Sequence, residues 1–269
     1  MNSNSKAGAF LAGKTALVTG STSGIGLGLA RALAEQGANI VFNGFGDAGA
    51  IEQLHQGIAK EFDIKTAYHN ADMSKPAEIA AMMAFAADKF GTVDVLVNNA
   101  GIQHVAAIED FPAEKWDAIL AINLSSAFHT TRLALPGMRK ENWGRIVNIA
   151  SVHGLVGSAQ KSAYVAAKHG LVGFTKVTAL ETADTGVTCN AICPGWVLTP
   201  LVQKQVDDRA ARDGIGGEEA KKALLSEKQP SGDFVTTADL GALAVFLCSP
   251  AASQVRGAAW NMDGGWAAQ

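Results

Sequence analysis

Short runs of β-branched and apolar residues alternate with longer helical patterns along the chain, and this alternation constrains the possible folds more than any other feature. Strands that alternate with helices form βαβ units, which build a mainly parallel sheet with helices on both faces. The runs contain few polar positions, as expected for strands buried on both sides. Helical patterns include the long stretches 113–140 and 162–183. Seven strands are predicted, in the segments 14–20, 38–44, 65–70, 93–101, 144–151, 186–195 and 258–265.

The sequence indicates a single domain. Neither a Pro- or Ser-rich linker nor an internal repeat interrupts residues 14–269, and residues 1–13 are an N-terminal extension with no assigned task. The exception is the charge-rich segment 198–235, which separates the sixth and seventh predicted strands. We predict that this segment is a helical lid over the crevice of the sheet, the alternative being a solvated flap.

Charge and cysteine content argue against several classes of function. A formal net charge of −3 gives no basic surface for a phosphate backbone, so no nucleic-acid partner is expected. Cys189, Cys193 and Cys248 are too few for a disulfide framework in 269 residues and fit a reducing compartment. No His or acidic residue in the segment of Cys189 and Cys193 completes a metal site, so none is predicted. The absence of an export signal and of a long apolar run predicts a cytoplasmic protein without a membrane partner.

Glycines gather where the first predicted strand meets the first predicted helix. The segment TGSTSGIG places Gly20, Gly24 and Gly26 at this junction. Glycine there lets backbone N–H groups and the helix N-terminus approach a pyrophosphate without obstruction by side chains. The spacing differs from the commonest dinucleotide fingerprint, so the loop alone leaves open a purely structural turn.

The end of the second predicted strand bears on the choice between the two nicotinamide cofactors, because the adenosine ribose lies there. The segment IVFNGFGDAG has no Arg or Lys to hold a 2′-phosphate, which favours NAD over NADP. It also lacks the acidic residue that usually binds the ribose of NAD. Phe45 could instead pack beside the adenosine and leave no room for a phosphate.

A Tyr and a Lys at helical spacing form the chemical centre of the sequence. Tyr164 and Lys168 are four residues apart, so their side chains share one face of the predicted helix. A neighbouring ammonium stabilises a phenolate and moves the pKa of the Tyr towards the working range. Ser151 follows the end of a predicted strand, at the edge where open parallel sheets bind ligands. A Tyr and a Lys at this spacing occur on many helices by chance, so the pair indicates a function only together with other motifs of the chain.

The chain also contains Asp72, Asn98-Asn99-Ala100-Gly101, Asn123 and Pro194-Gly195. Together with the glycine loop, Ser151, Tyr164 and Lys168, these motifs resemble those of the short-chain dehydrogenase/reductase family. The resemblance runs from Lys14 to Trp266. It implies a Rossmann-like, doubly wound parallel sheet, often a homotetramer, and hydride transfer between a nicotinamide and a secondary alcohol or ketone.

The resemblance assigns a role to each member of a catalytic tetrad. It implies that Tyr164 is the acid and base and that Ser151 orients the reacting oxygen. Lys168 would lower the pKa of the Tyr and hold the nicotinamide ribose, and Asn123 would position a water relay to that Lys.

The cofactor contacts are likewise carried over from the resemblance. Asp72 would contact the adenine, Asn99 the adenosine side, and Thr199 the nicotinamide carboxamide. The residues expected against the cofactor are Gly20, Thr22, Ser23, Gly24, Ile25, Gly26, Phe45, Asp72, Met73, Asn99, Ala100, Gly101, Tyr164, Lys168, Pro194, Gly195, Val197 and Thr199.

Four polar residues predicted to face the same crevice point to an acidic substrate. Gln103, His153, Lys161 and Gln205 can all donate hydrogen bonds, and one carries a fixed positive charge, which suits a carboxylate. Singly, each is more easily explained as a surface or core residue. Their surrounding segments are similar to family members that oxidise (R)-3-hydroxybutyrate, in which the four correspond to a clamp for the substrate carboxylate.

We therefore predict NAD-dependent interconversion of (R)-3-hydroxybutyrate and acetoacetate, with Trp196 and Trp266 as an apolar wall that limits chain length. One alternative is a 3-ketoacyl thioester reductase, which would prefer NADPH and need no carboxylate clamp. The other is an NAD-binding sensor that has lost catalysis. The intact Tyr164 and Lys168 argue against the sensor, because a protein that only binds gains nothing from a tuned phenol.

Overall fold

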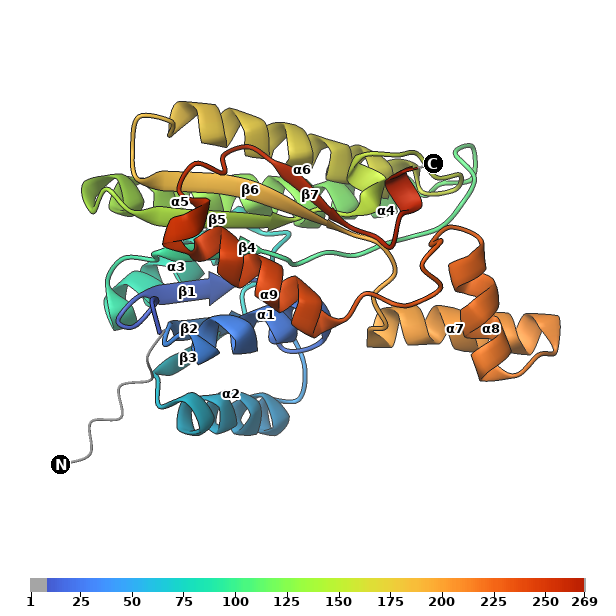
Figure 1. Cartoon of the computed structure of the whole chain (residues 1–269), viewed down its shortest axis with the longest axis horizontal. Coiled ribbons are helices and arrows are strands. Elements are labelled where there is room, and N and C mark those ends of the chain that lie inside the picture. The colour runs from blue at the N-terminus through green and yellow to red at the C-terminus, as the bar shows by residue number, and fades with distance from the viewer. Residues whose placement is uncertain (1–8, 269) are drawn as a thin grey trace.

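The computed structural model describes residues 9–268, and it contains a parallel sheet in the order β3-β2-β1-β4-β5-β6-β7 (Figure 1). Every pair of neighbouring strands is parallel, which confirms the predicted seven-stranded sheet. The strands are β1 (Thr15–Val18), β2 (Asn39–Asn43), β3 (Thr66–His69), β4 (Val95–Asn98), β5 (Gly144–Ile149), β6 (Val187–Pro194) and β7 (Ala259–Met262).

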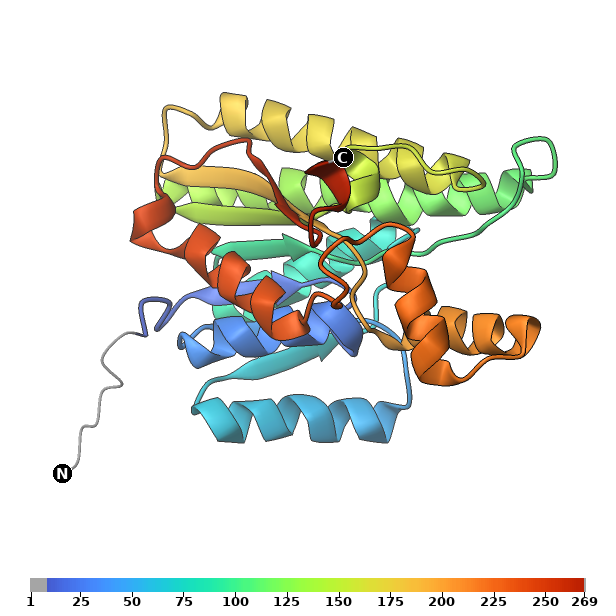
Figure 2. The same cartoon turned by 45° about the vertical axis from the view of Figure 1, so that its right-hand side comes forward.

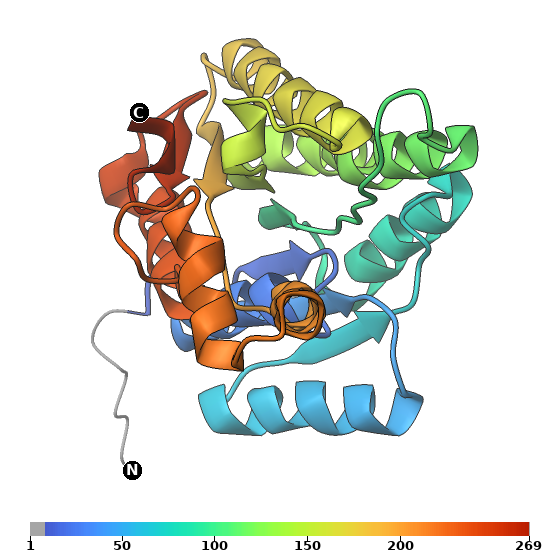
Figure 3. The ribbon, with the colours of Figure 1, turned by 90° about the vertical axis from the view of Figure 1, so that its right-hand side faces the viewer.

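Helices cover both faces of the sheet, as Figure 3 shows. Residues of α1, α2 and α9 belong to the apolar cluster on one face, and residues of α3, α5 and α6 to the clusters on the other. The helices are α1 (Gly24–Glu35), α2 (Ala48–Phe62), α3 (Pro76–Phe90), α4 (Ala113–Leu120), α5 (Ser126–Lys140), α6 (Ser162–Glu181), α7 (Pro200–Asp213), α8 (Gly217–Ser226) and α9 (Thr237–Cys248).

The central strands are apolar on both faces because successive side chains point to opposite sides. In β1, Ala16 and Val18 join the cluster under α1 and α9, whereas Leu17 joins the cluster under α3 and α5. All three side chains are fully buried. This burial explains the near-continuous apolar runs from which the strands were predicted.

The order of the strands determines where a ligand can bind. β1 pairs with β2 on one side and with β4 on the other. The connection after β1 therefore leads to one side of the sheet, and the connection after β4 leads to the opposite side. Open α/β sheets bind ligands at such a switch point, outside the carboxyl ends of the strands. The loops that follow β1, β4, β5 and β6 therefore meet at one edge.

Two helices stand beyond that edge. α7 and α8 project from the body of the molecule next to the carboxyl ends of the strands (Figure 2). They share a small apolar cluster of their own that includes Val202, Val206 and Leu224. The charge-rich segment 198–235 is thus a helical excursion between β6 and β7, as predicted, and we call it the lid.

The described part of the N-terminal extension packs on the domain. Leu11 is fully buried in the core, and its backbone N–H donates to the carbonyl of Gln36 at 3.0 Å. The remainder of that predicted extension, residues 1–8, lies outside the described residues. Within residues 9–268, no helix is both long and apolar enough to cross a bilayer.

Candidate active site

A cavity of about 480 Å³ opens at the carboxyl edge of the sheet, and it gathers most of the predicted site residues. All the predicted cofactor and substrate residues line it, together with Ser151, Tyr164 and Lys168; Asn123 does not. Ten further lining residues were not predicted from the sequence. Most of them are small or apolar and lie next to predicted residues, so no reactive or charged group marks them. They are Asn43, Gly44, Ala71, Ile102, Ile122, Ile149, Ala150, Val152, Pro200 and Val202.

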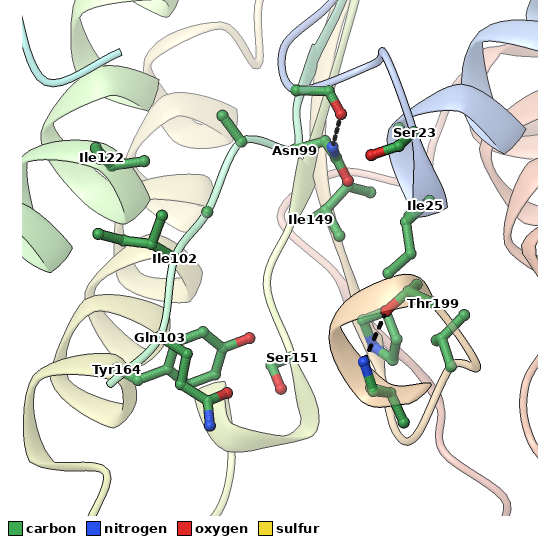
Figure 4. Close-up of a pocket in the computed structure, with 18 of the residues that line it drawn as sticks. Ser23, Ile25, Asn99, Ile102, Gln103, Ile122, Ile149, Ser151, Tyr164 and Thr199 are labelled. Carbon is green, nitrogen blue, oxygen red and sulfur yellow. Dashed lines mark hydrogen bonds between the residues drawn. The ribbon is translucent and has the colours of Figure 1, made fainter. Parts of the chain in front are cut away.

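The glycine loop after β1 has no room for a side chain at Gly26. A Cβ on Gly26 would lie 2.2 Å from the carbonyl oxygen of Gly20, so α1 can start only with glycine at that position. The amide of Asn99 donates to the carbonyls of Thr19 and Gly20 at 2.9 and 3.0 Å, which fixes the loop to the end of β4 (Figure 4). The N-terminus of α1 therefore faces the cavity with its backbone N–H groups, an arrangement suited to a pyrophosphate.

No charged side chain of the described residues at the end of β2 lines the cavity. Asn43 uses its amide within the protein, accepting from Gly20 and donating to the carbonyls of His69 and Ala71. Phe45 is 67% exposed beside this strand end. Among the described residues that line the cavity, the only Lys or Arg side chains are Lys161 and Lys168, which come from the 161–168 segment and not from the β2 end.

The Ser, Tyr and Lys of the predicted tetrad lie together at the other end of the cavity. Ser151 follows β5, and its hydroxyl oxygen accepts from the backbone N–H of His153 at 3.1 Å. Tyr164 projects from the first turn of α6 towards Ser151, and Gln103 lies beside it (Figure 4). Lys168 is one turn further along α6, with its Nζ 5.5 Å from the centre of the Tyr164 ring.

The predicted substrate residues surround this group. The His153 ring stands edge-on to Tyr164 and to Trp266, with ring centres 6.0 and 5.1 Å apart. Trp266 in turn lies 5.8 Å from Trp196, and the Nζ of Lys161 lies 5.3 Å from the centre of the Trp196 ring. An aromatic wall and a cation therefore lie within reach of the same ligand.

Comparison with known proteins identifies the family. The family model described as short chain dehydrogenase matches residues 14–210. The chain is 73% identical to a D-beta-hydroxybutyrate dehydrogenase of Cupriavidus necator over 97% of this chain and 100% of that one. It is 56% identical to a protein of the same name from Rhizobium meliloti, over 95% and 99% of the two chains. This chain belongs to the short-chain dehydrogenase family. Its fold matches that of L-sorbose reductase from Gluconobacter frateurii, solved with NADPH and L-sorbose, with a TM-score of 0.92, 29% identity and coverage of 96% and 98%.

Family membership assigns a nicotinamide cofactor to the cavity, and the residues present fit it. The tight backbone approach at Gly26 and the exposed N-terminus of α1 suit the pyrophosphate. Asp72 follows β3, and its carboxylate accepts from the backbone N–H and the hydroxyl of Ser74 at 2.9 and 2.7 Å. Thr199 accepts from the N–H of Val202, which caps α7 and places the start of the lid beside Gly24.

Burial is the largest influence on the pKa values of Tyr164 and Lys168. It raises the pKa of the Tyr164 hydroxyl, and the hydrogen bond with Ser151 acts in the opposite direction. Lys168 donates to the carbonyl oxygen of Ile149 at 2.7 Å, and burial lowers its pKa to about 8. The Lys168 ammonium is thus directed at a backbone carbonyl, 5.5 Å from the centre of the Tyr164 ring, and its effect on the pKa of Tyr164 stays a prediction.

The same reasoning makes His153 neutral. Burial lowers its pKa to about 4, helped by the positive charges of Lys161 and Lys228 and by His169. Burial also lowers the pKa of Lys161, with Lys228 as the second cause. At neutral pH the His153 imidazole is thus uncharged, and the nearby side chains of Lys161 and Lys228 attract an anion.

Asn123 serves a contact that the sequence did not predict. The stretch 113–140 is helical, as predicted, but residues Ala121–Ser125 form a π-helical turn between α4 and α5. From this turn, the Asn123 amide exchanges two hydrogen bonds of 2.9 Å with the backbone of Ile102. Asn123 is only 2% exposed. Its two hydrogen bonds hold the loop after β4, next to Gln103, against the π-helical turn.

Proposed function

We propose that this short-chain dehydrogenase interconverts (R)-3-hydroxybutyrate and acetoacetate with NAD as the cofactor. The observation that carries the proposal is the position of Lys161, His153, Gln103 and Gln205, which line the same cavity as Tyr164. A carboxylate only accepts hydrogen bonds, so it is matched by donors and a fixed cation. The printed names of the relatives at 73% and 56% identity support the same substrate.

The chemistry follows from the placement of Tyr164. In oxidation its phenolate would take the proton of the substrate hydroxyl, while Ser151 donates a hydrogen bond that orients the same oxygen. NAD supplies the acceptor for the hydride that leaves C3. Lys168 would contribute positive charge near the phenolate and hydrogen bonds to the nicotinamide ribose. In the reverse direction Tyr164 protonates the developing alkoxide.

The choice of NAD is supported by the β2 end. No cation follows Asn43 and Gly44 in the loop 44–47, so a 2′-phosphate would have no counter-charge there. We propose that Phe45 packs beside the adenosine, that Asp72 and Met73 lie at the adenine, and that Thr199 meets the carboxamide. A test is the ratio of kcat/KM for NAD to that for NADP, which should exceed one; faster turnover with NADP would reverse this proposal.

The whole protein is proposed to work as a cytoplasmic homotetramer of single-domain chains, without a nucleic-acid or membrane partner. In this proposal residues 14–269 form the cofactor-binding domain and the lid 198–235 closes over the substrate. Gln205, on α7, would then approach the carboxylate as water leaves the cavity.

A ketoacyl thioester reductase is the second candidate. A reductase of this kind from Vibrio cholerae, which acts on 3-oxoacyl-[acyl-carrier-protein], is 35% identical over 95% of this chain. A thioester carries no carboxylate, however, and would leave the donors around Lys161 without an anionic partner. The two candidates therefore differ in what they demand of Lys161.

The deciding experiment is an NADH absorbance assay on both enantiomers of 3-hydroxybutyrate, repeated with Lys161→Ala. We expect turnover of the (R) acid only, and a KM for it raised about tenfold to a hundredfold in the variant, since a charge-assisted hydrogen bond contributes roughly 1.5–3 kcal/mol. Lys60→Ala, on the exposed surface of α2, is the matched control and should keep the wild-type KM. No turnover of the (R) acid, or an unchanged KM in Lys161→Ala, would refute the proposal.

A further inference from the structure

Gln229 is a buried amide behind the substrate cavity. It lies in the stretch that returns the chain from α8 to α9, and only 1% of its surface is exposed. It does not line the cavity. Buried polar side chains need hydrogen-bond partners, so its contacts indicate its task.

Both ends of the Gln229 side chain are engaged at the base of the lid. Its Oε1 accepts from the backbone N–H of Trp196 at 2.8 Å, and its Nε2 donates to the carbonyl of Asp233. The carbonyl of Trp196 accepts from the N–H of Val235 at 2.9 Å. The backbone of Trp196 is thus held on both sides by the segment that contains Gln229.

The same side chain fills the space between the ends of β6 and β7. A Cβ on Gly195 would lie 2.5 Å from the Oε1 of Gln229, and a Cβ on Gly264 would lie 2.6 Å from its Cγ. The N–H of Ser231 donates to the carbonyl of Gly264 at 3.0 Å. In Figure 2 the chain after α8 accordingly runs back beside the C-terminal segment. Gln229 therefore contacts the residue before Trp196 and the turn that leads to Trp266.

Those two tryptophans form one series of contacts with the reacting groups. Trp196 packs on Trp266, Trp266 on His153, and His153 on Tyr164, with successive ring centres 5.8, 5.1 and 6.0 Å apart. A displacement of the backbone at Trp196 would move the wall that faces the substrate without touching Ser151, Lys168 or the glycine loop.

We propose that Gln229 is a positioning residue that fixes the Trp196–Trp266 wall and thereby sets the preference for a short 3-hydroxy acid. This inference rests on the proposed function. Without the Gln229 amide, the N–H of Trp196 has no acceptor in a buried place, and the backbone must shift to find one. The wall then recedes, and a longer alkyl chain fits where a methyl group fitted before.

The test replaces the amide with a side chain of similar volume that makes no hydrogen bonds, in Gln229→Met. The kcat/KM values for (R)-3-hydroxybutyrate and (R)-3-hydroxyhexanoate are compared, and NADH binding is followed by fluorescence. We expect the ratio of the two kcat/KM values to move about tenfold towards the longer acid, mainly through KM, since one methylene in a pocket is discriminated by about tenfold or more. NADH affinity should remain within about twofold, because Gln229 does not line the cavity. A larger change would mean that the shift at Trp196 spreads to Gly195, which is expected against the cofactor, and would contradict a role confined to the wall.

Gln203→Met is the matched control. Gln203 is also a lid glutamine, but its amide donates to the exposed Asp207 at 2.7 Å, so this variant should keep the wild-type ratio. If Gln229→Met does not fold, Gln229→Asn carries the test: it keeps an amide but shortens its reach by one methylene, and a shift of about threefold in the same direction is expected.

The outcomes separate this inference from the proposed function. A folded Gln229 variant that binds NADH and keeps the wild-type ratio would overturn the positioning role while leaving the substrate assignment intact. Failure of the wild-type protein to oxidise (R)-3-hydroxybutyrate would instead overturn the proposed function, on which the inference depends.

Discussion

The charge state of single residues in the cavity is decided by burial as much as by neighbours. His153 is 5% exposed and lies among Lys161, Lys228 and His169, so desolvation and positive charge both oppose its protonation. A neutral imidazole can donate one hydrogen bond to a carboxylate through one nitrogen, whichever tautomer is present. Its Nε2 has no hydrogen-bond partner within the described residues. This nitrogen can therefore bond to a ligand, or to a residue that approaches when the lid moves.

This burial makes the stability of the protein depend on pH. The folded pKa of His153 is about 4, below the unfolded value of 6.5, so between these values the unfolded chain binds a proton that the folded chain does not. Stability should therefore fall as pH falls through this window. The free energy of unfolding of the wild type should therefore decrease between pH 7 and pH 5. In His153→Gln this decrease should be smaller by on the order of 2 kcal/mol, because the imidazole is absent.

Urea unfolding of wild type and His153→Gln at both pH values measures this difference. The comparison at pH 7 corrects for any change in packing, because both forms are then uncharged at this position. An equal loss of stability in the two proteins between pH 7 and pH 5 would mean that His153 takes up a proton as easily in the folded state as in the unfolded one.

The types of the site residues could be predicted from sequence, but their electrostatics could not. Ser151, Tyr164 and Lys168 were identified because strand ends and helical spacing are local properties of the sequence. The raised pKa of Tyr164 and the bond from Lys168 to the Ile149 carbonyl depend on tertiary burial, which spacing does not report. The role of Gln229 was missed for the same reason, since its partners are 33 and 4 residues away in the chain.

At the level of elements, the junction of β1 and α1 has no room for a side chain at Gly26. In Gly26→Ala the new methyl group would meet the carbonyl of Gly20, which belongs to the loop that lines the cavity. We expect the Kd for NADH to rise more than about tenfold, since displacement of the loop weakens several phosphate contacts at once. Fluorescence titration of NADH measures the effect.

Gly57→Ala provides the matched control for this junction. Gly57 lies in α2, and a methyl group added there would meet no atom within 4 Å and would keep an ordinary helical conformation. Alanine there should leave the Kd unchanged and raise stability by roughly 0.5–1 kcal/mol, because it restricts the unfolded chain. If Gly26→Ala bound NADH as tightly as Gly57→Ala, the close approach of the loop would not be needed for the cofactor.

Periodicity located the helical stretches 113–140 and 162–183, but it did not identify α9 or the irregularities inside the predicted helices. The stretch 113–140 gave no sign of the π-helical turn at Ala121–Ser125, because a single extra residue in one turn hardly alters an apolar pattern. The lid was predicted as helical from its charge and position. Its division into α7 and α8 follows from Gly214, which has a φ of 66° and ends the first of them.

At the scale of the molecule, the alternation of strands and helices predicts a parallel sheet but not the order of its strands. The doubly wound arrangement was implied by the resemblance to a family, and the structure bears it out. The physical reason is that right-handed crossovers permit several windings of the same elements. The site at the carboxyl edge then follows from the winding, since β1 and β4 lie side by side although they are far apart in sequence.

The proposed homotetramer needs interaction surfaces, and exposed apolar side chains on two pairs of elements are candidates for them. On α5 and α6, Phe128, Val177 and Leu180 are 46%, 52% and 76% exposed, and on α9 and β7, Phe246 packs on Trp260 with both partly exposed. Exposed apolar patches mark interaction surfaces, and two separate twofold interfaces on one chain would generate the proposed closed assembly of four.

The α6 patch offers a direct test of this assembly. Leu180→Glu would place a carboxylate in the proposed twofold interface, where the symmetry would bring two copies of the charge together. The mass in solution should then fall from the four chains of the proposed tetramer to two. Light scattering after gel filtration measures it. Ile108→Glu, at a loop position that is 77% exposed and outside both patches, should leave the tetramer intact. If Leu180→Glu still elutes as a tetramer, the α6 face is open to solvent and the apolar side chains on it need another explanation.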